Sequence, residues 1–260
     1  MYVAQASKAL LGRGKVFFDR LTTAGVSTGL RFLGTVSKLE ISTSDEQAKI
    51  YDYSRADAPL LDQALTRREV TLSMSLQEFS AENVALALMG DDVGFTQTTS
   101  PIVDEPITTS VVKGRSYQTL GRDISAITIE KSPATVLVLG TDYDVVDVKL
   151  GLIHIREGSV TVTNGDTILA TYTRGTIAAP GISRVQAAKA ARIVGKLVFV
   201  GDPAAGIAYD MEVWKLFISS EGALGLITES EFGTFELNGM VLSDEALHPT
   251  EPFYRLTQRN

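Results

Sequence analysis

The segment Val70–Gln77 alternates strictly between apolar and polar side chains. Because successive side chains of a β-strand point to opposite sides, this pattern predicts a strand with one apolar and one polar face. Such a strand packs one face on a core and turns the other to water. The apolar members are Val70, Leu72, Met74 and Leu76, and the polar members are Thr71, Ser73, Ser75 and Gln77. The chain is therefore expected to be mainly β, with residues 34–42 as a second strand.

Composition narrows the class of protein. At 260 residues the chain can bury a sizeable core and fits one large domain or two modest ones. No run of 18 apolar residues occurs, so no membrane insertion is expected. The absence of cysteine excludes disulfides and thiolate metal sites, and it favours a reducing cytoplasm as the place of synthesis. With a net charge of −7, the chain lacks the excess of basic residues that usually accompanies nucleic-acid binding.

Turn-rich stretches at 98–106 and 178–181 divide the chain into three blocks. Between them lie short β-rich runs at 126–129, 135–139, 143–148, 152–155, 160–162 and 168–172, which predict a small β-sandwich. The third block returns to longer strands at 192–200, 208–219 and 232–241. The simplest organisation is one β domain made of residues 1–100 and 181–260, interrupted by an inserted module at 101–180.

Residues 42–69 separate the first two strands and are rich in charge. Loops longer than about 12–15 residues are uncommon inside compact domains, and ordering one costs about 1–2 kcal/mol of backbone entropy per residue. Six large apolar side chains nevertheless lie among the charges: Ile50, Tyr51, Tyr53, Leu60, Leu61 and Leu65. We therefore expect this long loop to become ordered against a partner, most simply a second copy of the chain.

A short helix is expected at residues 81–89, directly after the second strand. Ser80 is a suitable N-cap, and Gly90 is a suitable residue for the C′ position. A helix of about nine residues is marginal by itself. It is therefore expected to rest on a sheet.

The sequence contains few residues or motifs that are typical of catalytic or metal-binding sites. The two histidines, His154 and His248, lie far apart, and no Gly-x-Ser-x-Gly elbow, phosphate loop or dinucleotide fingerprint occurs. The acidic set Asp142, Asp144 and Asp147 has two readings, a calcium site or solvated turn residues, and it lacks the glycine and terminal glutamate of the twelve-residue calcium loop. We expect no enzyme activity, no catalytic residues, no metal and no cofactor.

Several patterned segments belong together: 14–19, 32–36, 39–42, the charged segment after them, 70–76, 80–91, 192–199 and 232–242. Their order resembles that of the major tail tube protein of long-tailed (siphovirus-like) bacteriophages. The resemblance implies a β-sandwich or barrel core with one short flanking helix, assembled into hexameric rings that stack into a hollow tube. The module at 101–180 is similar to the extra surface modules of some of these tubes.

The resemblance also implies partners and a location. The partners would be further copies of the chain, tape-measure, tail-tip and tail-terminator proteins, and double-stranded DNA that passes through without specific binding. The location would be the tail of the virion, assembled in the host cytoplasm. Six copies at −7 each would give 6 × (−7) = −42 per ring, which repels DNA if that charge faces inward.

Two sets of candidate site residues follow from the resemblance. Candidates for the lumen lining are Thr71, Ser73, Ser75, Gln77, Thr234, Glu236 and Asn238. The charged segment 43–69 occupies the position of a loop that contacts the adjacent ring. Its candidates for inter-ring stacking are Asp45, Glu46, Tyr51, Asp52, Tyr53, Arg55, Asp57, Arg67 and Arg68.

Three other interpretations stay open. A secretion-system-type tube protein shares the ring architecture. A carbohydrate-binding β-sandwich adhesin would need exposed aromatic side chains on one face, for which Tyr117, Tyr143 and Tyr172 are available. A metal-free β-sandwich hydrolase would need a nucleophile–base pair, and none presents itself in the sequence.

Overall fold

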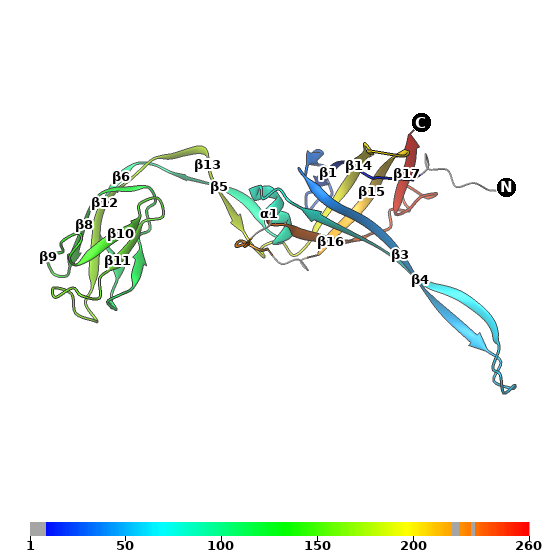
Figure 1. Ribbon diagram of the computed structural model, residues 1–260, viewed down its shortest axis with the longest axis horizontal. Coiled ribbons are helices and arrows are strands. Elements are labelled where there is room, and N and C mark those ends of the chain that lie inside the picture. Colours follow the sequence, from blue (N-terminus) through cyan, green and yellow to red (C-terminus); the bar gives the residue numbers. More distant parts are fainter. Residues whose placement is uncertain (1–8, 220–223, 230–231, 260) are drawn as a thin grey trace. The chain divides into compact units, whose positions relative to one another are not determined.

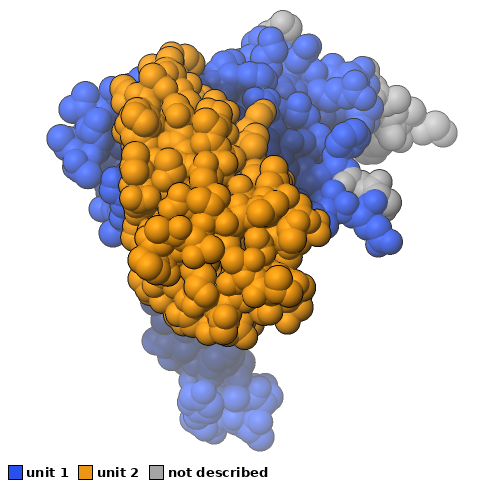
Figure 2. Space-filling model, turned by 90° about the vertical axis from the view of Figure 1, so that its left-hand side faces the viewer, with its two compact units in different colours: residues 1–92, 185–260 blue, residues 93–184 orange. Residues whose placement is uncertain are grey.

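The computed structural model describes residues 9–219, 224–229 and 232–259. It confirms a mainly β fold with several antiparallel sheets and one short helix. The chain divides into two compact units, one made of residues 1–92 and 185–260 and the other of residues 93–184 (Figure 2). The sequence placed the corresponding boundaries at 100 and 181.

The first unit is built on one eight-stranded sheet with the order β2-β1-β14-β15-β16-β4-β3, in which β17 also pairs with β15 (Figure 1). Its strands are β1 (Gly14–Arg20), β2 (Arg31–Phe32), β3 (Val36–Tyr51), β4 (Leu60–Leu76), β14 (Ile193–Gly201), β15 (Ala208–Ser219), β16 (Phe235–Val241) and β17 (Tyr254–Arg259). The antiparallel pair of β4 and β16 joins the first and third blocks of the sequence in one sheet. The final strand, β17, was not expected from the sequence.

The apolar face of β4 lies in the core, as its alternation predicted. Val70, Leu72, Met74 and Leu76 are each no more than 2% exposed. Helix α1 (Ala81–Ala87) packs on the same core through Leu86 and Ala87. The core cluster also contains side chains of β1, β14, β15 and β16, so it joins most strands of this sheet.

The ends of α1 confirm one prediction and correct another. The Ser80 hydroxyl accepts a hydrogen bond from the Asn83 backbone N–H, as expected of an N-cap. At the other end, Met89 and not Gly90 takes the left-handed C′ conformation, with φ of +49°. The Gly90 N–H donates to the Ala85 carbonyl at 2.7 Å, which completes a Schellman motif. Glycine is needed at position 90 because a Cβ there would lie 2.5 Å from the Gln186 carbonyl oxygen.

The prediction of a long loop at residues 43–69 is wrong. Strands β3 and β4 continue through these residues as a paired hairpin. The two strands stay paired in antiparallel register from Thr43↔Val70 to Tyr51↔Leu60, and the register shifts locally at bulges. We call residues 43–69 the arm (Figure 1). Both of its faces meet solvent, so its side chains do not show the alternation by which a half-buried strand is found in a sequence.

The second unit contains two sheets, one of order β10-β11-β7 and one of order β6-β12-β8-β9. Their strands are β6 (Ser100–Thr108), β7 (Ser116–Gln118), β8 (Ile124–Lys131), β9 (Thr135–Val136), β10 (Tyr143–Asp147), β11 (Leu152–Ile155) and β12 (Ile168–Arg174). A single buried cluster that includes Ile129, Ile153 and Tyr172 lies among them. The architecture is therefore that of a small β-sandwich.

Two features of this region differ from expectation. Residues 160–162 form no strand, because the Ser159 hydroxyl accepts from the Val162 backbone N–H and turns the chain there. A separate two-stranded ribbon was missed, formed by β5 (Asp91–Gln97) and β13 (Ile177–Gln186). The sequence around Pro180 read as a boundary and not as a strand.

Candidate functional site

The register of the sheet brings the seven expected lumen residues onto one face. Ser73 lies opposite Asn238, and Ser75 lies opposite Glu236. Gln77 and Thr234 each lie one residue beyond the pair Leu76↔Phe235. Thr71 belongs to the same face of β4, which points away from the core because the intervening residues are buried. We call this surface the polar face. Its seven residues are half-buried or exposed.

Strand β3 extends the polar face with charged residues that the sequence did not single out. Lys38 pairs with Ser75 across the strands, and Glu40 pairs with Ser73. The Lys38 ammonium lies 3.0 Å from the Glu40 carboxylate, so these two charges offset each other. No ion pair among the described residues involves Glu236, whose carboxylate therefore adds a negative charge to this face.

The net charge is unevenly divided between the two units. Residues 93–184 carry eight lysines and arginines and nine aspartates and glutamates, a net charge of −1. The remaining −6 of the chain's −7 therefore belongs to the unit that bears the arm and the polar face.

The charged stacking candidates of the arm are already paired with one another. The Arg68 guanidinium donates two hydrogen bonds to the Asp45 carboxylate, at 2.7 and 2.8 Å. These bonds lower the pKa of Asp45 and raise the pKa of Arg68. Two further ion pairs are Arg67 with Glu46 at 3.2 Å and Arg55 with Asp57 at 3.5 Å.

Asp52 is also engaged within the arm. Its carboxylate accepts hydrogen bonds from the Ser54 hydroxyl and the Ser54 backbone N–H, which lower the pKa of Asp52. The charged candidates are therefore engaged with partners within the hairpin itself. Of the residues proposed for stacking, only Tyr51 and Tyr53 remain to carry an outside contact by apolar area.

The far end of the arm exposes large apolar side chains. Tyr53 is 83% exposed, Leu61 63% and Ile50 62%. The rings of Tyr51 and Tyr53 lie 6.2 Å apart in a tilted arrangement, so they form one patch. An isolated two-stranded hairpin is marginally stable in water. We call residues 50–62 the arm tip.

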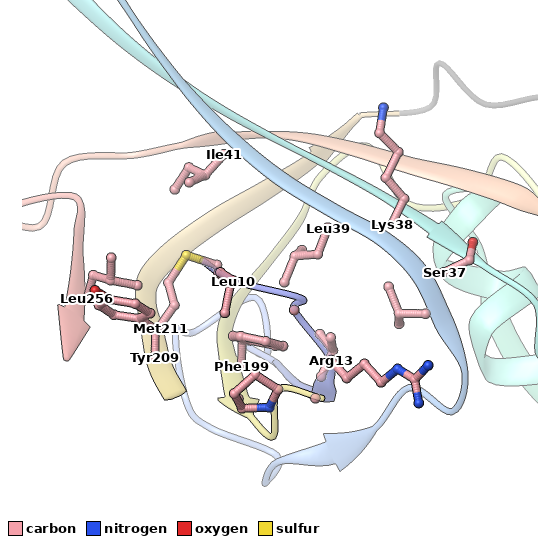
Figure 3. Close-up of a pocket in the computed structure, with 16 residues that line it drawn as sticks. Leu10, Arg13, Ser37, Lys38, Leu39, Ile41, Phe199, Tyr209, Met211 and Leu256 are labelled. Atoms are coloured by element: carbon pink, nitrogen blue, oxygen red, sulfur yellow. The ribbon is translucent and has the colours of Figure 1, made fainter. Parts of the chain in front are cut away.

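A pocket of about 420 Å³ lies in the same unit, where the arm leaves the sheet (Figure 3). The side chains of Leu39 and Ile41 from β3 face those of Phe199, Met211 and Leu256 across it. Lys38, on the same strand, lies at the edge of the pocket, and its side chain points away from Leu39 and Phe199. We call this the apolar pocket. No local pattern could have revealed it, because its walls come from strands that are far apart in the sequence.

The three aspartates considered for calcium are each used by neighbouring groups. Asp142 accepts from the Ser159 hydroxyl at 2.6 Å, and Asp144 pairs with Arg156 at 2.6 Å. Asp147 accepts from two backbone N–H groups in its turn. No group of three or more potential ligands is placed to hold a metal ion in the part of the chain that the structure describes.

One pair of polar side chains was not identified from the sequence. The Ser116 hydroxyl lies 3.1 Å from His154 Nδ1, because β7 and β11 place these residues opposite each other. Asp144 lies opposite His154 on β10, but its carboxylate is bound to Arg156. The row Ser116, His154 and Asp144 therefore does not form a relay in which the carboxylate orients the histidine.

The aromatic side chains considered for sugar binding do not form an exposed platform. Tyr143 and Tyr172 are 4% and 2% exposed and belong to the core of the second unit. The hydroxyl of Tyr117, which is half-buried, donates to the Val112 carbonyl. Among the residues that the structure describes, no helix is long and apolar enough to cross a membrane.

No curated protein matches the chain. A family model described as "protein of unknown function UCP028589" matches residues 9–252, which include all of the second unit and most of the first. Since this match covers almost the whole sequence, the chain belongs to that family.

Proposed function

We propose that this chain is a structural subunit that assembles with identical copies into stacked rings, as in the tube of a bacteriophage tail. The observation that carries the proposal is the arm, whose tip exposes Tyr53, Leu61 and Ile50 to solvent. Such side chains in a two-stranded hairpin favour burial against a partner. A self-assembling protein supplies that partner with every copy.

The polar face supports a conduit for DNA. A wall that made about 6–10 cationic phosphate contacts would hold a duplex through counterion release. Here Lys38 is offset by Glu40, and Glu236 adds a negative charge. We propose this face as the lumen lining and assign the chain to the virion tail. Tape-measure, tail-tip and tail-terminator proteins would then be its neighbours.

Electron microscopy of the purified protein over a range of concentrations tests the proposal. Rings or tubes are expected to form as concentration rises. The variant Tyr53→Ser/Leu61→Ser should keep the fold, because both side chains are exposed, but it should assemble poorly. A matched control changes two exposed side chains of the other unit, Val136→Ser/Val160→Ser. A wild-type protein that stays monomeric at all concentrations would overturn the proposed function.

A further inference from the structure

Among the residues that the structure describes, the apolar pocket exposes apolar side chains to solvent. Leu256 on one wall is 56% exposed, and Leu10, which also lines the pocket, is 57% exposed. All the residues that line it are described, and none of them is acidic. Arg13 lies at its margin (Figure 3). A fitting occupant is therefore apolar and carries negative charge.

The arm tip has this chemistry. Besides its exposed Tyr53, Leu60 and Leu61, the tip contains three aspartates and one arginine, a net charge of −2. A pocket of about 420 Å³ has room for side chains of the tip. Apolar side chains that entered it would leave water, which is favourable by about 25 cal/mol per Å² of apolar surface buried. The tip and the pocket are thus complementary in polarity and in charge.

The tip of a chain cannot fill the pocket of the same chain. Ile41 in the pocket wall and Tyr51 in the tip belong to one continuous strand, β3. The ten residue-to-residue steps from Ile41 to Tyr51 span about 33 Å at the rise of a β-strand. Folding the tip back onto its own pocket would break the paired hairpin. The occupant must come from another molecule.

We propose that the apolar pocket of one copy binds the arm tip of a second copy. This inference rests on the proposed self-assembly and assigns the receptor for the arm. Tip and pocket are different surfaces, so each copy offers one of each, and the contact can be repeated from copy to copy.

Site-directed cross-linking tests the proposal, because the natural chain has no cysteine. Tyr53→Cys and Leu256→Cys are purified separately, mixed and oxidised, and the covalent heterodimer is measured. Leu10→Cys repeats the test at a second pocket position. The matched control is Met240→Cys, which is 41% exposed and lies opposite Thr71 on the face turned away from the pocket. We expect at least tenfold more heterodimer with either pocket variant than with the control.

Two outcomes separate this inference from the proposed function. Equal yields with Leu256→Cys, Leu10→Cys and Met240→Cys would overturn the docking of the tip, even if microscopy shows tubes. Selective cross-linking without any rings or tubes would support the docking and count against the proposed function.

Discussion

Asp19 shows how a single buried carboxylate fixes a loop of the first unit. Asp19 is only 5% exposed. Its carboxylate accepts hydrogen bonds from the Ser27 hydroxyl and from the backbone N–H groups of Thr28 and Gly29. Burial alone would raise the pKa of Asp19, but these hydrogen bonds together outweigh it and lower the pKa. The ionised form therefore stabilises the folded state.

This predicts a pH-dependent effect of Asp19→Asn. At pH 7 the free energy of unfolding should fall by about 1.5–3 kcal/mol, because hydrogen bonds to a charged acceptor are lost. Since the folded pKa lies below the unfolded value of about 3.9, the contribution is present above that pH and disappears as the pH falls through the folded pKa. Urea unfolding at pH 7 and at pH 2–3 measures it. A difference between wild type and variant that stays constant with pH would contradict the account.

Glu236 is the residue at which the proposed lumen can be tested directly. Because Glu236 is exposed, Glu236→Lys should leave folding and assembly unchanged, while the new cations of a ring attract phosphate and slow DNA ejection several-fold. The matched control is Glu157→Lys, an exposed glutamate of the other unit. Equal ejection rates for the wild type and both variants would argue against a lumenal position of this face.

Strand β4 allows its two faces to be compared at neighbouring positions. Leu72 is 1% exposed in the core, whereas Ser73 lies on the polar face. Leu72→Ala is expected to cost about 2–5 kcal/mol of stability because it leaves a cavity. Ser73→Ala should change stability by no more than about 0.5 kcal/mol. Chemical denaturation of both variants measures the difference, and similar losses in both would contradict the assignment of the faces.

The elements that the sequence predicted well are those with one buried face. The alternation at 70–77 and the cap at Ser80 are local signals, and β15 begins and ends where the sequence placed its strand. The arm was missed because its strands meet water on both faces and its ordering pairs, such as Asp45 with Arg68, join residues far apart in the sequence. The polar face depended on register, and the apolar pocket depended on the assembly of five separate segments. Neither surface could therefore be predicted from the sequence of a single segment.

At the scale of the whole molecule, the two units have separate cores. The core cluster of the first unit contains no residue from 93–184, and the cluster of the second unit contains only such residues. The two crossings of the chain lie close together in the first unit, because the Ala188 and Ala190 N–H groups donate to the carbonyls of Leu88 and Met89. Deletion of the second unit should therefore leave the two ends of the first unit joined where the chain was removed.

Replacing residues 93–184 by a short glycine–serine turn should leave a folded first unit. Because it keeps the arm, the apolar pocket, the polar face and a net charge of −6, it should still form the proposed rings or tubes. Circular dichroism with thermal unfolding reports on the fold, and electron microscopy reports on assembly. A shortened chain that unfolds would contradict the independence of the two cores. One that folds but stays monomeric would show that assembly requires the second unit, because the arm and its receptor would both be intact.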